Sequence, residues 1–467
     1  MSYNTASTSR PNAIGLAQPF SNFDWNYPSQ SGNVDFSAAF TNANGNLSIT
    51  AGASGGINEL KLNGSAVIGG DILVNSGSLN LAGSGGPYTW TLKSNLTIAA
   101  QADLNLTAGS SGSYTLVLNG SGVQTYACLG TNRATKLNWT VNSGSTLNLS
   151  NDLSLAIVGR TLAAVGNVNL NGRDLATDLV TGTGIIANQG GGTGHLNVGT
   201  GNGTNLLDGT LSLVDGTSGT LSLIKSGSGL LTITANNVFS GGLTVSNGTV
   251  LVNNTSGSGT GTGPVTVLAG SLGGTGIISG AVTVQGGKLS PGNSIGRLTV
   301  NNTVTLLSDT SIEIDKSAST NDQVVATVIN YGGTLTVTNL NGSLVAGDSY
   351  TIFSAGSFTG NFSSIIGVPG QGLAWSFNPT NGTITVEQSI ATTPTNLVFN
   401  VSGSNLALSW PTEYLGWVIE AQTNSLASGI SANTNDWHIL PGTELVTATN
   451  LTIDPANPTV FFRMRLP

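Results

Sequence analysis

Short runs in which apolar and polar residues alternate fill most of this chain. They include Leu47–Ile49, Leu79–Leu81 and Leu147–Leu149. Alternation places every second side chain on the same face of a strand. The longer period of an amphipathic helix is absent almost throughout the sequence. The pattern therefore predicts an all-β protein.

Two arrangements of these strands fit the turns between them. Asn-Gly pairs such as Asn63–Gly64, Asn119–Gly120 and Asn171–Gly172 are typical of antiparallel hairpins. The same turns could instead join the strands of successive coils in a solenoid. Because the turns are irregularly spaced, periodicity alone leaves both arrangements open.

The stretch from Leu223 to Val252 favours the solenoid. Its residues follow the order Lys-x-Gly-x-Gly-x-Leu-x-Ile from Lys225, Phe-Ser-Gly-Gly-x-Thr-Val from Phe239, and Asn-Gly-Thr-Val from Asn247. This order resembles the passenger-associated repeat of bacterial autotransporters. The resemblance implies a right-handed parallel β-helix, or β-solenoid, and an extracellular protein.

The resemblance continues beyond the repeat but does not reach the whole chain. Residues 265–386 resemble the segment that typically follows the repeat in autotransporter-like proteins, with Leu289–Val300 as one of the matching stretches. Residues before Leu223 resemble the repeat only in their general pattern of short strands and polar turns. We therefore predict that the β-helix occupies residues 34–388.

The last part of the chain has a different composition. Residues 389–467 are richer in aromatic residues and proline, and their strand patterns predict a small β-sandwich. The order Leu-Ser-Trp-Pro, Tyr-Leu-Gly-Trp-Val-Ile-Glu and Phe-Phe-Arg-Met resembles fibronectin type III-like modules. Trp410 and Trp417 are expected in its core rather than on a sugar-stacking surface.

The first 33 residues form a third region. Phe20, Trp25 and Tyr27 lie among prolines in a segment without regular alternation. Such a segment could cap the open strand edge of the first coil. Alternatively, it could be an arm that docks onto a neighbouring copy of the chain.

Composition and charge exclude several partners. Charged residues make up 7% of the chain and the net charge is −8, with only 13 Lys and Arg residues. Nucleic-acid binding requires clustered cations, so nucleic acid is not expected as a partner.

No apolar run is long enough for a transmembrane helix, and no signal peptide is visible at the first residues. Cys128 is the single cysteine, so it is expected to be a small buried residue or to form an intermolecular disulfide.

Parallel β-helices also include polysaccharide lyases and hydrolases, whose sites need clustered carboxylates. Glu313 and Asp315 share one strand face, with Asp309 near them and Lys316 next to them. Lys316 could simply neutralise these carboxylates on a solvated strand face. Carboxylates from distant coils could also converge, so this alternative stays open.

The remaining candidates for chemistry are weaker. Arg173 and Asp174, with Asp178, follow an Asn-Gly pair and are typical of turn residues. His195 and His438 are isolated and do not form a metal-binding pair. We therefore predict no catalytic residue, no metal site and no cofactor.

The sequence as a whole predicts a non-enzymatic extracellular structural or adhesive protein of a bacterial surface. Its expected partners are copies of itself, in fibres, and surface glycans. A polysaccharide-active β-helix enzyme or a glycan-binding module is the alternative. Both ends of the chain are expected to supply assembly contacts, through Phe20, Trp25, Tyr27, Val460, Phe461 and Phe462.

Overall fold

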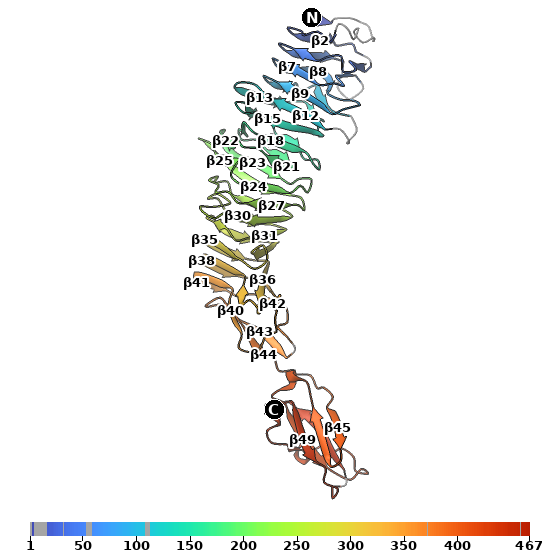
Figure 1. The fold of residues 1–467 in the computed structure, drawn as a ribbon, viewed down its shortest axis with the longest axis vertical. Coiled ribbons are helices and arrows are strands. Elements are labelled where there is room, and N and C mark those ends of the chain that lie inside the picture. The colour runs from blue at the N-terminus through green and yellow to red at the C-terminus, as the bar shows by residue number, and fades with distance from the viewer. Residues whose placement is uncertain are drawn as a thin grey trace. The chain divides into compact units, whose positions relative to one another are not determined.

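The structure is a computed structural model, and its strands are shown in Figure 1. It describes residues 2–3, 16–30, 32–52, 58–107, 113–370, 372–457 and 459–467. The chain divides into two compact units. The first unit comprises residues 1–311, 322–334 and 354–363, and the second comprises residues 312–321, 335–353 and 364–467.

The chain forms a parallel β-solenoid of about 13 turns, followed by small antiparallel sheets. This confirms the predicted fold class. In the first unit, strands from successive coils stack into long parallel sheets (Figure 1).

Four sheets make up the solenoid in the first unit. The first sheet contains β1 (Ser2–Tyr3), β2 (Phe23–Tyr27), β5 (Leu47–Ala51), β8 (Ile72–Asn80), β10 (Leu96–Ile98), β13 (Val123–Cys128), β16 (Thr146–Leu149), β19 (Asn167–Asn169), β22 (Ile185–Asn188) and β25 (Ser212–Asp215), with β3 (Val34–Asp35), β6 (Glu59–Lys61), β11 (Ala102–Asn105) and β14 (Thr131–Asn132) beside them. The second sheet contains β4 (Asn42–Ala43), β7 (Ala66–Ile68), β9 (Tyr88–Leu92), β12 (Tyr114–Leu118), β15 (Leu137–Val141), β18 (Thr161–Ala164) and β21 (Leu179–Thr181).

The other two sheets belong to later coils. The third sheet contains β17 (Leu153–Leu155), β20 (Leu175–Thr177), β23 (Gly192–Val198), β26 (Gly219–Lys225), β28 (Leu243–Val245), β30 (Val265–Val267), β32 (Ile277–Ile278), β33 (Val282–Val284), β35 (Arg297–Leu306), β38 (Gln323–Tyr331) and β41 (Phe353–Gly360). The strands of the fourth sheet that lie wholly in the first unit are β24 (Asn205–Leu207), β27 (Leu230–Ile233), β29 (Thr249–Val252), β31 (Ser271–Gly274) and β34 (Lys288–Pro291).

In-register stacking explains the alternation in the sequence. Along the third sheet, one inward position is apolar and buried in every coil, at Leu223, Leu243, Val265, Val282 and Val304. The next position points outward and carries threonine in four consecutive coils, at Thr244, Thr266, Thr283 and Thr305. Each coil therefore buries its apolar residues against those of its neighbours and presents hydroxyl groups to solvent.

The Asn-Gly pairs turn the chain between sheets. Asn171 and Gly172 have φ angles of 53° and 74°, and this left-handed conformation favours Asn and Gly. They lie between β19 of the first sheet and β20 of the third sheet. Here the pair serves as a corner of a coil rather than as the tip of a hairpin.

An amide and carboxylate ladder connects the first coils. The residue just before β2, β5, β8 and β10 is an Asn or Asp, and its Oδ1 accepts a hydrogen bond from a backbone N–H of the next coil. The bonds run from Asn46 to Asn22, from Asp71 to Asn46, from Asn95 to Asp71 and from Thr125 to Asn95, at 2.8 to 2.9 Å. The ladder satisfies backbone donors that lie just before the strands or, at Thr125, just before the pairing of β13 with β10 begins.

Replacing Asp71 should separate the role of its shape from that of its charge. Burial acts to raise the pKa of Asp71, but hydrogen bonds from Ser94 and Asn95 outweigh it and lower the pKa below its ordinary value. The ionised form therefore stabilises the fold above the ordinary aspartate pKa of about 3.9, and this contribution is lost as the pH falls through the folded-state value. Asp71→Ala should cost about 1–2 kcal/mol at neutral pH, and Asp71→Asn, which keeps the acceptor, less than about 0.5 kcal/mol.

Amide hydrogen exchange at Asn95, measured between pH 3 and pH 7, tests this prediction. In the Asn variant the protection of this amide should no longer depend on pH. Equal loss of protection in the Ala and Asn variants would contradict the ladder role.

In the second unit, strands also pair antiparallel. β43 (Leu373–Asn378) and β44 (Thr383–Gln388) form a hairpin, with β40 (Ser349–Thr351) on the other side of β44. This part was expected to continue the β-helix, but the close Asn381–Gly382 turn, with φ of 70° at Gly382, lets consecutive strands pair directly. The unit also holds β37 (Thr320–Asn321), β39 (Thr334–Asn339) and β42 (Ser364–Ile366), and part of β36 (Asp309–Asp315).

The tail folds around an aromatic core between two three-stranded antiparallel sheets. The core consists of Leu408, Trp410, Tyr414, Trp417 and Ile419, so both tryptophans predicted for the core lie in it. One sheet has the order β45 (Val398–Ser402), β46 (Asn405–Ser409), β49 (Ala448–Thr452), and the other β48 (His438–Ile439), β47 (Val418–Thr423), β50 (Val460–Arg465). Three short 3₁₀ helices span Thr412–Tyr414, Thr434–Asp436 and Thr443–Leu445. The likeness of the tail to fibronectin type III modules stays a prediction.

Candidate functional site

Asp315, one of the two carboxylates predicted as a candidate site on one strand, makes structural contacts. Glu313 and Asp315 occupy outward positions of β36, the strand on which Asp309 also lies. The Asp315 carboxylate accepts hydrogen bonds from the Ala318 backbone N–H at 2.9 Å and the Asn341 side chain at 2.7 Å. These bonds lower the pKa of Asp315 below its ordinary value. Asp315 therefore fixes a turn and stays ionised.

Lys316 has a different partner from the one expected. Its ammonium forms an ion pair with Asp348 rather than neutralising Glu313 and Asp315. The hydrogen bond to Asp348 raises the pKa of Lys316, and the same bond lowers that of Asp348. The pair fastens neighbouring turns within the second unit, and it does not assemble a carboxylate cluster.

The second acidic candidate separates into an exposed part and a buried part. Arg173 and Asp174 are exposed, whereas Asp178 is only 1% exposed. The Asp178 carboxylate accepts three backbone hydrogen bonds, from Gly159 at 2.6 Å, Gly201 at 2.9 Å and Gly203 at 2.6 Å. A carboxylate with this many donors serves as an anchor between coils, and it is not presented to a substrate.

Lys225 is a buried cation that the sequence did not single out. Its side chain is fully buried, and its Nζ donates to the backbone oxygens of Ser226 at 2.6 Å and Gly227 at 2.9 Å. Burial lowers the pKa of Lys225, and the charge of Asp178 acts in the opposite direction. A Cβ at Gly248 would lie 2.8 Å from this Nζ, so the glycine leaves room for the ammonium.

The histidines and the cysteine remain isolated. His438 is exposed and His195 is partly buried, and they belong to different units. No group of three or more His, Cys, Asp or Glu residues that could hold a metal occurs among the described residues. Cys128 is a free thiol and is only half-buried, in contrast to the expected buried residue, because its strand ends at the corner of a coil.

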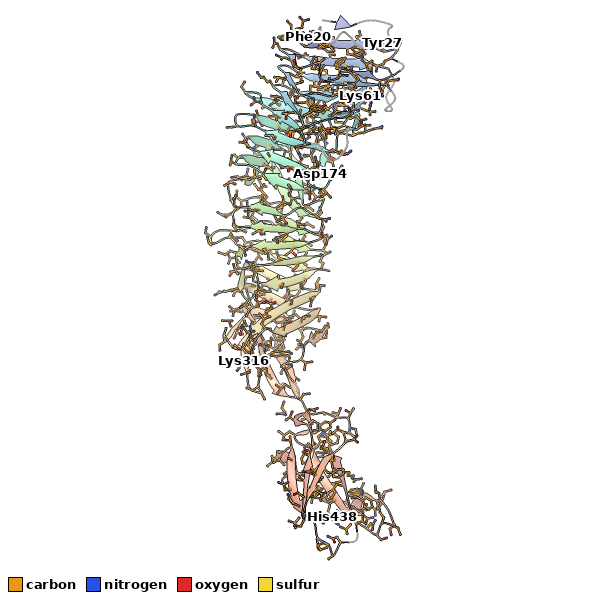
Figure 2. The ribbon with its side chains drawn as sticks, turned by 45° about the vertical axis from the view of Figure 1, so that its right-hand side comes forward. Phe20, Tyr27, Lys61, Asp174, Lys316 and His438 are labelled. Carbon is orange, nitrogen blue, oxygen red and sulfur yellow. The ribbon has the colours of Figure 1, made fainter. Side chains whose placement is uncertain are left out.

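The N-terminal residues predicted as assembly contacts belong to the first coil. Phe20 and Trp25 are 4% exposed, and their rings pack with Phe23, Phe36 and Phe40. Tyr27 is partly buried and ends β2, which pairs in parallel with β5. Figure 2 labels Phe20 and Tyr27 at these first coils. This placement favours the capping interpretation, although residues 1, 4–15 and 31 of the segment lie outside the described residues.

The C-terminal residues predicted as assembly contacts lie on β50. Val460, Phe461 and Phe462 are partly buried, and β50 pairs antiparallel with β47 in its own sheet. Among the described strands β50 stands at the edge of that sheet. One side of its backbone is therefore paired and the other remains at an edge.

A charged cluster on the tail was missed by the sequence analysis. Glu420 on β47 is opposite Arg463 on β50, and its carboxylate accepts hydrogen bonds from Arg463 Nε at 2.8 Å and Arg465 Nε at 2.6 Å. Burial acts to raise the pKa of Glu420, but these bonds outweigh it and lower the pKa. The Arg463 guanidinium also lies 4.1 Å from the centre of the Trp437 ring. The available signal was the spacing of Arg463 and Arg465, which places both on one strand face.

Comparison with known proteins identifies one repeat. The family model of the passenger-associated-transport-repeat matches residues 223–252, which include Lys225 and strands β27, β28 and β29. The repeat points to an autotransporter passenger β-helix, and it suggests a place at the cell surface or outside the cell. No curated protein matches the chain. No helix in the described part of the chain is long and apolar enough to cross a membrane.

Proposed function

We propose that this chain is a non-enzymatic structural or adhesive protein of a bacterial surface that associates with copies of itself. The matched repeat and the parallel solenoid support an extracellular passenger-like role. The low charge of the chain, at 7% charged residues, supports association because it removes the repulsion that usually keeps β-edges apart. Two of the acidic candidates, Asp315 and Asp178, are bound within turns and corners, which favours a structural role over catalysis.

One observation on the tail carries the proposal of self-association. Phe399 and Val401 of β45 are 70% and 53% exposed. They pair with Leu408 and Leu406, and these two residues belong to the core or pack against it. Phe399 and Val401 therefore lie on the core-facing side of the sheet without a cover.

A strand from a second copy would complete this tail. It would pair with the free edge of β50 and place alternate apolar side chains over Phe399 and Val401. Strand addition of this kind combines backbone hydrogen bonds with pockets for alternate side chains. The partly buried Val460, Phe461 and Phe462 would then belong to the border of the contact.

Sedimentation of the full chain over a range of concentrations tests the proposal. The double variant Phe399→Ser/Val401→Ser should weaken self-association at least about tenfold, because it removes the apolar surface that a strand would cover. Val398→Ser is a matched control, since Val398 is 63% exposed but lies on the opposite face of the same strand. It should associate as the unmodified chain does.

Three outcomes would contradict the proposal. A chain that remains monomeric at high concentration would exclude self-association. Equal weakening by the control would indicate unspecific apolar contact. Turnover of acidic or neutral glycans by the purified chain would replace the structural role with the enzymatic alternative.

A further inference from the structure

The outer face of the sheet formed by β47 and β50 carries a compact charged cluster. Val418 of β47 is opposite Arg465 of β50, and Glu420 is opposite Arg463. These four residues lie on the opposite face of their strands from Ile419, a core residue, and from Met464, which packs against the core. The cluster is therefore on the solvent side of the sheet, away from the tail core.

The geometry holds both guanidinium groups in place through one carboxylate. The Glu420 side chain is 5% exposed, whereas those of Arg463 and Arg465 are 34% and 42% exposed. Arg463 approaches one carboxylate oxygen with Nε and Nη2, at 2.8 and 2.7 Å, and Arg465 approaches the other oxygen with Nε at 2.6 Å. The indole of Trp437, itself only 7% exposed, lies against Arg463. Two cations share one anion, so the cluster keeps a net positive charge.

Donor groups remain open on the solvent side of this cluster. A guanidinium has five N–H donors in a rigid plane. The contacts to Glu420 use Nε of Arg465 and the Nε and Nη2 edge of Arg463. The two side chains stay 34% and 42% exposed, so their remaining N–H donors can reach a planar, two-oxygen anion in a bidentate manner.

We propose that Arg463 and Arg465, held by Glu420, bind a carboxylate or sulfate group of an acidic polysaccharide. They are the only Lys or Arg residues after Lys316, so the cluster is an isolated positive site on an acidic chain. A site with two arginines fits a polysaccharide, in which a single sugar unit presents one anionic group. It does not fit a nucleic acid or an anionic membrane, because those bind to extended arrays of cations. The site does not depend on the proposed self-association.

Titration of the full chain with oligogalacturonate and with a sulfated oligosaccharide tests the inference, and a neutral cello-oligosaccharide serves as the control ligand. The acidic ligands should bind and the neutral one should not. Arg465→Gln should weaken binding at least about tenfold, as expected for loss of a charge-assisted bidentate contact. Lys316→Gln is the control variant, because it removes a cation outside the cluster, and it should leave binding unchanged.

Amide hydrogen exchange at the paired strands β47 and β50 checks that each variant keeps its fold. If Arg465→Gln fails to fold, Arg465→Lys provides the test. It keeps the charge but loses the planar fork, and it should still weaken binding several-fold. The inference would be overturned if the Arg465 variant bound the acidic ligands as tightly as the unmodified chain, or if the neutral ligand bound equally well. It would also be overturned if the chain bound vesicles with anionic lipids but not the acidic oligosaccharides. In those cases the cluster is an ion-pair network that holds β47 to β50.

Discussion

Replacing Asp178 with alanine is expected to destabilise the coils around it by about 3–5 kcal/mol. The carboxylate is buried and receives hydrogen bonds from the backbone of Gly159, Gly201 and Gly203. Its removal leaves these donors without their acceptor, and the donor at Gly201 is buried. It also removes the negative charge that acts in favour of the charged form of buried Lys225.

Because each coil of a solenoid contacts only its neighbours, the damage should be local. Hydrogen exchange and limited proteolysis should locate the opening between residues 159 and 227. Asp174→Ala is the matched control, since this carboxylate is exposed four residues earlier. Asp178→Asn keeps one acceptor and should have a smaller effect. An Asp178→Ala variant as protected as the control would show that the anchor is dispensable.

Replacing Gly184 with alanine should have the second largest effect, about 2–4 kcal/mol. A Cβ at this position would lie 1.8 Å from the carbonyl oxygen of Gly166 and 2.9 Å from that of Ala164. Both obstacles are backbone of the preceding coil, so the two coils would have to separate. The hydrogen bond from the Gly184 N–H to the Ala164 oxygen, at 2.9 Å, would be lost as well.

Gly191→Ala separates this packing effect from the general cost of losing a glycine. A Cβ at Gly191 would meet no atom within 4 Å, so the control should unfold like the unmodified chain. The measurement is chemical denaturation, together with hydrogen exchange at strands β19 and β22. Similar stability of the two variants would mean that the coils can adapt to a wider spacing.

Alternation in the sequence was sufficient for the all-β class, because inward residues such as Leu243 and Val265 repeat from coil to coil. The choice of a solenoid over hairpins depended on the order of residues 223–252. The same alternation was present at the N-terminus, where Phe23 and Trp25 are two positions apart and both buried. The prolines and aromatic residues of that segment do not distinguish between its two interpretations. The same composition fits a segment that forms part of the first coil and an arm that docks onto a neighbouring copy. Only the pairing of β2 with β5 separates the two cases.

The anchoring and charged contacts could not be predicted from local patterns. Asp178 receives hydrogen bonds from residues 19 to 25 positions away, and Glu420 receives them from residues 43 and 45 positions away. Which residues meet depends on the length of every intervening coil or loop. The lengths vary irregularly, so the register is fixed only by the folded chain.

The ladder from Asn22 to Asn95 has a consequence for the environments in which the protein can work. Three of its four acceptors are neutral amides, and all its donors are backbone N–H groups. Dissolved salt screens charges over a Debye length of about 10 Å at 0.1 M, but it leaves neutral hydrogen bonds almost unaffected. Cohesion between these coils should therefore be nearly the same in dilute water and in brine.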